Sequence, residues 1–456
     1  MSFGLALSGG GSRAAAFHRG TLMGLSETGL LDAVEVVSTV SGGSVFGAAW
    51  MASRARGEAL ETFLAQMRAE LARGFIARTL RPRLLMVLLP GYTRSNALAG
   101  TFDGVFFRGM TLADLPERPR LVMNATVLNN GQVGKFAREG FKAGGLVPPG
   151  SLDFSAWIPL PEYSVALAAT ASAAFPVGLP PVYLGRGKGG VPEGWGSTPA
   201  LAEADRIALT DGGVLENLGI QTLLNPKSEF RAWDLAASDA GARQEIWSPG
   251  GPVNLLRGLA MGVVSAPVLE RITILMNDEE DRHMRHDLFD DTEEGWLVQA
   301  LRDPAVAGRP DLKAFLATQD DGPRRRVLMV RVSQGWGHFV TRIPRWRLVG
   351  LAHDYELRTG LGAPAPPAWD DVGGKESFLA AVGSDLGPAK AIFTAMGGAA
   401  AVERLNDVAT GFSALSTEAI DSLAEHARWQ VYANKAVYWD AAGEKSGGPN
   451  GGTERA

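Results

Sequence analysis

Short apolar runs alternate with amphipathic stretches along the first fifty residues of the chain. Residues 3–7 and 34–37 are runs of strand length, and a glycine-containing turn follows each of them. Apolar residues then recur at helical spacing within the stretches 14–31 and 45–51. This order of strand, helix, strand and helix predicts a mostly parallel sheet with helices packed against it.

Later parts of the chain contain more runs with the length and composition of buried strands. They are residues 121–126, 207–210, 272–276 and 327–332. The stretch 55–100 is instead helical in composition and rich in arginine, and it includes the apolar run 84–89. Its simpler interpretation is a helical layer whose arginines are solvated, and the alternative is a cationic apolar surface that touches an anionic membrane.

Glycine and proline mark the boundaries in the second half. We interpret the stretch 185–199 as a long loop and the stretch 360–374 as a boundary. Beyond that boundary, a helical C-terminal segment is expected over 375–440. Residues 443–456 lack a core-forming pattern and are expected to be disordered.

Composition excludes several classes of protein. The 456 residues carry a net charge of −5 and contain no cysteine. A disulfide scaffold and thiolate chemistry are therefore excluded, and the slight acidity argues against a nucleic-acid-binding protein. The longest apolar run is far below the ~20 residues that a membrane-spanning helix needs. We expect a cytoplasmic protein, with peripheral membrane association as an option.

Ser41 has the strongest local signal for chemistry. It lies between a predicted strand and a predicted helix, in the run Ser38-Thr39-Val40-Ser41-Gly42-Gly43-Ser44. A serine at such a sharp turn is lifted out of the backbone, as in the nucleophile pattern G-x-S-x-G. Thr39 stands where the first glycine of that pattern belongs, so the pattern is met only in part. The alternative is a serine that caps a helix.

A second glycine turn follows the first predicted strand, at Gly9-Gly10-Gly11-Ser12-Arg13. Successive backbone N–H groups in such a turn can bind an anion, including the oxyanion of acyl transfer. The competing interpretation is a dinucleotide site, which needs an acidic residue at the end of the second strand. That strand instead leads to Ser41.

A third feature, Asp211-Gly212-Gly213, follows the apolar run 207–210. An aspartate at the end of a strand can point into the ligand cleft of an α/β sheet, although a turn aspartate that caps its own backbone is the alternative. Asp239 is a rival carboxylate. No histidine lies beside these motifs, so Asp211 itself can be the base. The six histidines are His18, His283, His286, His338, His353 and His426.

In this order, the three features resemble the patatin-like phospholipase family in its bacterial form. The matching runs include Leu7-Ser8-Gly9-Gly10-Gly11-Ser12-Arg13-Ala14, Ser38-Thr39-Val40-Ser41-Gly42-Gly43-Ser44, Asn124-Ala125-Thr126, Ala169-Thr170-Ala171-Ser172-Ala173-Ala174-Phe175-Pro176, Asp211-Gly212-Gly213-Val214 and Ala237-Ser238-Asp239-Ala240. The resemblance covers roughly residues 3–245 well and the remainder loosely.

The resemblance implies a three-layer α/β/α sandwich around a mostly parallel sheet, with a patatin-like α/β hydrolase domain over 1–360. Ser41 would be the nucleophile and Asp211 the base of a Ser–Asp dyad. The other implied site residues are the oxyanion loop, namely Gly9, Gly10, Gly11, Ser12 and Arg13, and the supporting glycines, namely Gly43, Gly212 and Gly213.

The activity so implied is hydrolysis of phospholipid or other acyl esters, with no metal, cofactor or nucleic acid. Two alternatives stay open: an acyltransferase or thioesterase with the same dyad, and a catalytically silent lipid-binding protein. The stretches 55–100 and 143–162 are candidates for a lid or for membrane contact. The sequence indicates no oligomeric state.

Overall fold

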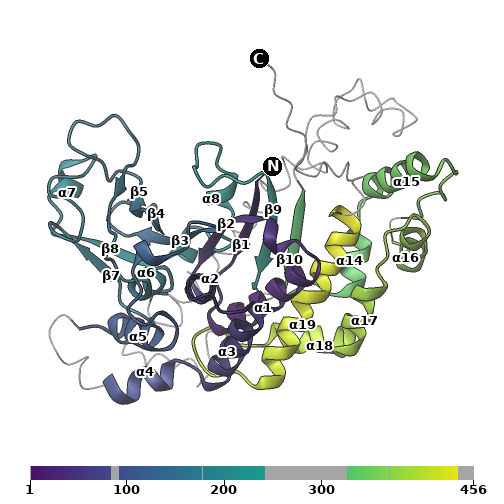
Figure 1. The fold of residues 1–456 in the computed structure, drawn as a ribbon, viewed down its shortest axis with the longest axis horizontal. Coiled ribbons are helices and arrows are strands. Elements are labelled where there is room, and N and C mark those ends of the chain that lie inside the picture. The colour runs from purple at the N-terminus through teal and green to yellow at the C-terminus, as the bar shows by residue number, and fades with distance from the viewer. Residues whose placement is uncertain (1, 84–91, 177, 242–325, 369, 440–456) are drawn as a thin grey trace, which may run out of the picture.

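A single sheet organises the part of the chain that the structure, a computed structural model, describes: residues 2–83, 92–176, 178–241, 326–368 and 370–439. Its strands follow the order β10-β9-β1-β2-β3-β4-β5-β6 (Figure 1). The first five of these are parallel: β10 (Val327–Arg331), β9 (Asp234–Asp239), β1 (Phe3–Leu7), β2 (Val34–Val40) and β3 (Arg120–Val127).

Antiparallel strands extend the sheet beyond β3. They are β4 (Gln132–Ala137), β5 (Gly140–Ala143) and β6 (Trp157–Ile158), together with β8 (Arg206–Asp211) and β7 (Val182–Gly185), which pair beside β3. The strands expected at 3–7, 34–37, 121–126, 207–210 and 327–332 are confirmed, whereas 272–276 lies outside the described residues. Strands β4 to β7 were missed because they are short and carry polar or glycine residues.

Helices pack on both faces of the sheet, so the expected fold class is confirmed. One face is covered by α1 (Gly11–Glu27), α2 (Gly42–Ala55), α3 (Leu60–Arg73) and α19 (Thr417–Asn434) (Figure 1). The other is covered by α8 (Gln221–Leu224) and its flanking loops, where Leu223 and Phe230 are buried in one cluster with residues of β1, β2, β3 and β9.

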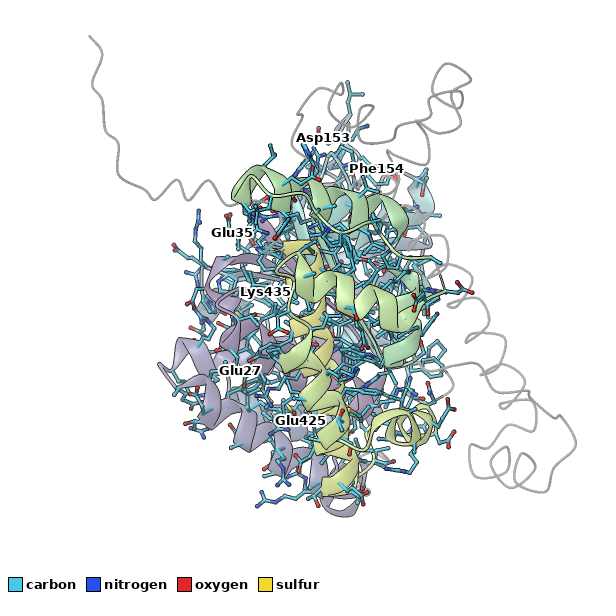
Figure 2. The ribbon with its side chains drawn as sticks, turned by 90° about the vertical axis from the view of Figure 1, so that its right-hand side faces the viewer. Glu27, Glu35, Asp153, Phe154, Glu425 and Lys435 are labelled. Atoms are coloured by element: carbon cyan, nitrogen blue, oxygen red, sulfur yellow. The ribbon has the colours of Figure 1, made fainter. Side chains whose placement is uncertain are left out.

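The long C-terminal helix α19 lies against the edge strand β10. Its Gln430 side chain accepts from the Arg331 N–H at 2.7 Å and donates to the Arg331 carbonyl at 2.8 Å. Arg428 donates to Glu27 of α1 at 2.6 Å and to Glu425 at 3.0 Å. Both glutamates are labelled in Figure 2. Side chains of α19 thus satisfy backbone groups that an edge strand otherwise leaves unpaired.

The remaining helices surround this core. They are α4 (Ile76–Arg83), α5 (Arg94–Phe102), α6 (Val165–Ser172), α7 (Pro199–Ala202), α14 (Trp336–Arg342), α15 (Arg345–Thr359), α16 (Val372–Ala381), α17 (Gly387–Ala395) and α18 (Gly398–Asn406). The stretch 55–100 is helical as expected, while its apolar run 84–89 and the tail 443–456 lie outside the described residues. No helix in the described ranges is long and apolar enough to cross a membrane.

Helix α2 begins in direct contact with the end of β1. A Cβ atom added at Gly43 would lie 2.3 Å from the carbonyl oxygen of Leu7 and 2.6 Å from that of Ser8. Both obstacles are backbone atoms of a buried strand end, which cannot rotate aside. Gly43 therefore permits the close packing of the two halves of the β-α-β-α unit.

We expect Gly43→Ala to lower the free energy of unfolding by about 3 kcal/mol or more, because a methyl group there must displace backbone. Urea unfolding followed by circular dichroism measures the loss. Gly104→Ala is the matched control, since a Cβ at exposed Gly104 has no neighbour within 4 Å. Equal stability of the two variants would contradict the packing argument.

Candidate active site

Ser41 occupies a strained turn between β2 and α2. Its backbone angles are φ 52° and ψ −122°, a region that L-residues rarely adopt and that costs about 1–3 kcal/mol. In the described part of the chain, Arg108 is the only other non-glycine residue with positive φ. The strain lies at the residue that the sequence singled out, which is typical of an exposed nucleophile turn.

The glycine loop after β1 lies directly against this turn. A Cβ at Gly9 would lie 3.1 Å from the Cβ of Ser41, and a Cβ at Gly42 would lie 2.6 Å from the amide nitrogen of Gly11. The absence of side chains at Gly9 and Gly42 therefore brings the loop amides next to the Ser41 side chain.

Asp211 meets Ser41 from the opposite direction. The Ser41 hydroxyl donates to Asp211 Oδ2 at 2.6 Å, and Gly213 N–H donates to Asp211 Oδ1 at 2.8 Å. The rival carboxylate, Asp239, instead accepts from Gly241 N–H at 2.8 Å. The structure thus brings Ser41 together with Asp211.

Asp211 arrives on an antiparallel strand of this mostly parallel sheet. Strand β2 pairs with residues 120–124 of β3, and β8 pairs antiparallel with residues 125–127 along the same edge. The carboxyl ends of β2 and β8 therefore meet nearly head to head. An antiparallel β8 is what delivers the aspartate to the serine.

Burial governs the protonation of Asp211. The residue is 2% exposed, and desolvation raises its pKa to about 7, although hydrogen bonds from Ser41 and Gly213 oppose this change. A carboxylate is an inefficient base for a serine hydroxyl when its pKa is near 4. Burial thus moves Asp211 toward the range in which a general base works at neutral pH.

The predicted oxyanion loop offers two unoccupied donors. Gly9 N–H is bonded to the Asn217 carbonyl at 2.9 Å, and Ser12 N–H to the Gly411 carbonyl at 2.6 Å. Gly10 and Gly11, which have φ of +130° and +58°, make no amide hydrogen bond within the described part of the chain. Their two N–H groups are the donors that remain for an oxyanion.

Asn217 connects this loop to the loop of Asp211. Its Oδ1 would lie 2.1 Å from a Cβ at Gly9 and 2.7 Å from a Cβ at Gly213, so its side chain packs on both glycines. Gly212 is equally confined, because a Cβ there would lie 2.3 Å from the carbonyl oxygen of Asn124. Asn217 had no predicted role, although it lies only six residues after Asp211.

A C-terminal segment, residues 407–415, lies across the start of α1. Besides the Gly411 contact, the Val408 carbonyl accepts from Arg13 Nη1 at 3.0 Å, and the Phe412 carbonyl accepts from Phe75 N–H at 2.9 Å. Arg13 is buried, and desolvation lowers its pKa to about 10, with the charge of Asp239 acting in the opposite direction. Arg13 thus anchors the 407–415 segment at the edge of the loop.

Histidines in the described ranges do not reach Ser41. His18 is fully buried with its Nε2 on the Ser8 carbonyl at 2.9 Å and its Nδ1 on Ser238 Oγ at 2.8 Å, and burial lowers its pKa to about 4. His426 is likewise buried and bonded on both ring nitrogens. His283 and His286 lie outside the described residues. No group of three or more potential metal-ligating side chains occurs in the described ranges.

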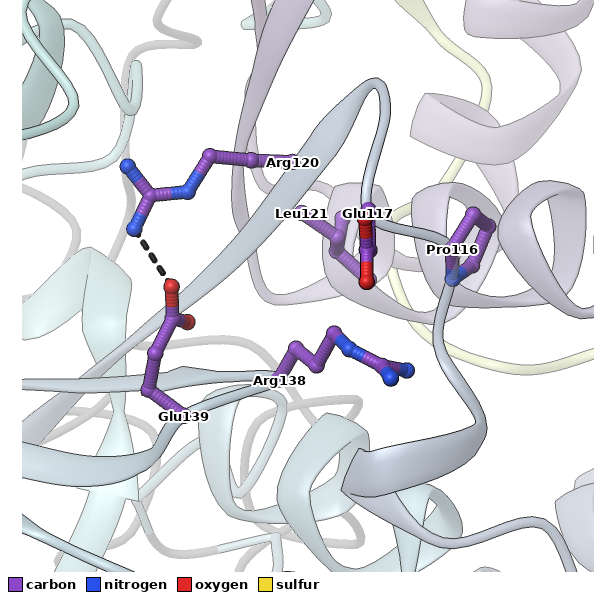
Figure 3. Close-up of a pocket in the computed structure, with 6 residues that line it drawn as sticks. All are labelled: Pro116, Glu117, Arg120, Leu121, Arg138 and Glu139. Carbon is purple, nitrogen blue, oxygen red and sulfur yellow. Dashed lines mark hydrogen bonds and ion pairs between the residues drawn. The ribbon is translucent and has the colours of Figure 1, made fainter.

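A cavity of about 390 Å³ lies at the amino end of β3 (Figure 3), lined by Pro116, Glu117, Arg120, Leu121, Arg138 and Glu139. The register pairs Val36 with Arg120 and Val40 with Asn124, so this end of β3 is about 13 Å from the Ser41 end. The cavity is therefore separate from the Ser41 site.

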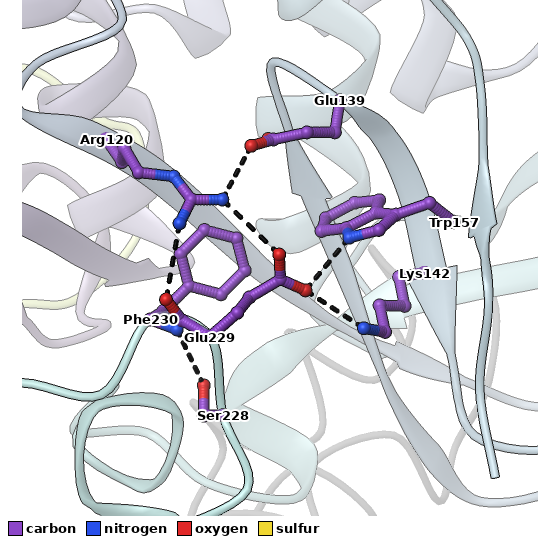
Figure 4. Close-up of polar contacts among 7 residues, drawn as sticks. All are labelled: Arg120, Glu139, Lys142, Trp157, Ser228, Glu229 and Phe230. Atoms are coloured by element: carbon purple, nitrogen blue, oxygen red, sulfur yellow. Dashed lines mark hydrogen bonds and ion pairs between the residues drawn. The ribbon is translucent and has the colours of Figure 1, made fainter. Parts of the chain in front are cut away.

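Two of the charged residues that line this cavity, Arg120 and Glu139, belong to a cluster of ion pairs. Arg120 is 2.5 Å from Glu139 and 3.5 Å from Glu229. Glu229 also accepts from Lys142 Nζ and Trp157 Nε1, each at 2.9 Å (Figure 4). This cluster joins the loop before β9 to the antiparallel strands and is structural.

The exchange Asp211→Asn tests the buried carboxyl. The pKa of Asp211 is about 7 in the folded chain against an ordinary value of 3.8. The stability contributed by the protonated form is therefore complete below pH 4 and lost as pH rises to 7. We expect the free energy of unfolding of the variant to rise relative to that of the wild type between pH 4 and pH 7, by on the order of 4 kcal/mol in total.

Thermal melts from pH 4 to pH 9 measure this gain, and Asp32→Asn, at an exposed carboxyl, is the matched control. A stability difference for Asp211→Asn that does not change with pH would contradict the raised pKa.

Comparison with known proteins agrees with the fold and the motifs. The sequence model of the family described as patatin-like phospholipase matches residues 5–224. Among solved structures, the human GIVD cytosolic phospholipase A2 is 16% identical with a TM-score of 0.38, covering 57% of this chain and 45% of that one. VipD from Legionella pneumophila is 13% identical with a TM-score of 0.27, covering 73% of this chain and 61% of that one.

The chain thus spans less than two thirds of the length of either structure. The comparison with curated proteins found no match. The family match contains both the Ser41 turn and the Asp211 loop. Residues 5–224 thus form a domain of the patatin-like phospholipase family.

Proposed function

We propose that this chain is a phospholipase A or lysophospholipase that cleaves fatty-acyl esters with a Ser41–Asp211 dyad. The observation that carries the proposal is the 2.6 Å hydrogen bond from the Ser41 hydroxyl to Asp211 Oδ2 at a strained strand-to-helix turn. The raised pKa of Asp211 supports its role as the base.

In the first half of the reaction, Asp211 accepts the hydroxyl proton of Ser41 as Oγ attacks the ester carbonyl carbon. The oxyanion that forms is bound by the N–H groups of Gly10 and Gly11. The tetrahedral intermediate then breaks its bond to the alcohol, which leaves with the proton from Asp211. The fatty acyl group remains on Ser41 as an ester.

In the second half, water gives a proton to Asp211 and attacks the acyl carbonyl carbon. The same N–H groups bind the second oxyanion. When this intermediate collapses, the fatty acid leaves and Ser41 Oγ takes the proton back from Asp211. One residue thus serves as base and acid in turn, as a carboxyl with a pKa near neutrality can.

Contact with a lipid surface is part of this proposal, for a protein of the cytoplasm. The loop 144–156 carries the exposed side chains of Leu152 and Phe154, with Asp153 between them (Figure 2). Exposed apolar side chains at a loop tip can insert among lipid headgroups, although the acidic residue opposes binding to an anionic surface.

Fatty-acid release from mixed phospholipid vesicles tests the dyad. We expect Ser41→Ala and Asp211→Asn each to lower the rate by about 10³-fold or more, since each removes a reacting group. Ser26→Ala and Asp32→Asn change exposed residues of the same types and should keep wild-type rates.

Release that persists in Ser41→Ala would remove the nucleophile assignment. Vesicle binding without release, and without labelling by a fluorophosphonate, would support a catalytically silent lipid-binding protein. Acyl transfer that depends on an added acceptor would support an acyltransferase.

The pH profile tests the base. Because Asp211 accepts a proton only when ionised, kcat/KM should rise about tenfold per pH unit below 7 and level off above it. Initial rates on a soluble short-chain ester from pH 5 to pH 9 measure this profile without vesicle effects. A plateau that begins near pH 4 would indicate that Asp211 is ionised throughout and would contradict the raised pKa.

A further inference from the structure

A cluster of three buried hydroxyl groups lies beneath the Ser41 turn. It consists of Thr39 on β2, Ser44 on α2 and Ser172 at the end of α6, and all three are 0% exposed. Thr39 Oγ1 is 2.8 Å from Ser44 Oγ, which is 2.8 Å from Ser172 Oγ. The cluster thus joins three elements at the point where the Ser41 turn begins.

One member of this cluster bonds the Ser41 backbone directly. Ser172 Oγ accepts the Ser41 N–H at 3.0 Å, and its own proton goes to the Asn124 carbonyl at 2.5 Å. Since a carbonyl only accepts, the Ser172 oxygen is free to accept from Ser41 and from Ser44 with its two lone pairs. The direction of these bonds is therefore fixed at Ser172.

We propose that Ser172 is a positioning residue for the nucleophile: its hydroxyl oxygen holds the Ser41 N–H, and thereby the positive φ at which Ser41 Oγ reaches Asp211. This inference rests on the proposed function. The strain of the turn and the cost of a buried unpaired N–H are similar in size. Loss of the hydrogen bond from the Ser41 N–H to Ser172 Oγ is therefore enough to let the Ser41 backbone relax from its positive φ.

Ser172 is also connected to Asp211, through Asn124. The Asn124 carbonyl that takes its proton is the atom that confines Gly212, the residue after Asp211. The Asn124 side chain meanwhile donates to the Thr39 carbonyl at 3.0 Å. Ser172 thus contacts both the Ser41 backbone and the β3 residue against which Gly212 packs.

The same cluster accounts for threonine in place of the first glycine of the G-x-S-x-G pattern. The Cγ2 of Thr39 lies 2.7 Å from where a Cβ at Gly47 would be, so Gly47 provides the space for the larger residue. The Thr39 hydroxyl then contacts Ser44, which contacts Ser172. Thr39 is therefore part of the support of the turn.

Labelling by a long-chain alkyl fluorophosphonate separates positioning from folding, because it gives both the fraction of molecules that react and the rate constant of those that do. We expect Ser172→Ala to label to full amplitude but about 10- to 100-fold more slowly than wild type, with kcat reduced by the same factor and KM within about twofold. Thr170→Ala changes a buried α6 hydroxyl that has no hydrogen-bond partner among the described residues, and it should label at the wild-type rate.

An equal rate constant for Ser172→Ala and Thr170→Ala overturns the inference while leaving the dyad intact. Reduced amplitude at an unchanged rate constant also overturns it, because that is the result of a purely structural role. Should Ser172→Ala not fold, Ser172→Cys is measured in the same way, and slow labelling at full amplitude is expected because a thiol is a weak acceptor. A wild type that does not label through Ser41 overturns the proposed function, and this inference with it.

Discussion

The hydrogen bond between Ser41 and Asp211 requires two strands to end at the same point. Strands β2 and β8 share one edge of β3 and run toward each other, so each must turn away sharply where they meet. β2 does so through a residue with positive φ. β8 does so through Gly212, which fits against the Asn124 carbonyl, and Gly213, which fits against the Asn217 side chain. The strain and the glycines of the site both follow from this arrangement of strands.

Burial then shifts the pKa values of the ionisable side chains packed around the sheet, upward for acids and downward for bases. Desolvation raises the pKa of Asp211 to about 7 and lowers that of His18 to about 4. The carboxyl thereby becomes a usable base at neutral pH, while the imidazole is kept neutral and serves as a bridge between Ser8 and Ser238. Under the proposed dyad, the burial that makes a carboxylate a stronger base would make a histidine a weaker one.

Local sequence was enough to predict the features that depend on neighbouring residues. A strand, a serine and two glycines before a helix define the Ser41 turn, and the order of strands and helices predicts the parallel core. The antiparallel direction of β8 was not predictable, because it depends on pairing with β3 across about 85 residues. The contacts of Ser172 and of the 407–415 segment could not be predicted for the same reason, because their partners lie about 130 and 400 residues away along the chain.

Thr39 shows how such distant contacts change the meaning of a local motif. Judged against the G-x-S-x-G pattern, a threonine there weakens the case for a nucleophile, because glycine normally provides the space for the turn. Here Gly47 provides that space from the facing helix, and the added hydroxyl contacts Ser44. A glycine in such a motif indicates that free space is needed at one point of the fold. Gly47, eight positions further along the chain, provides that space equally well.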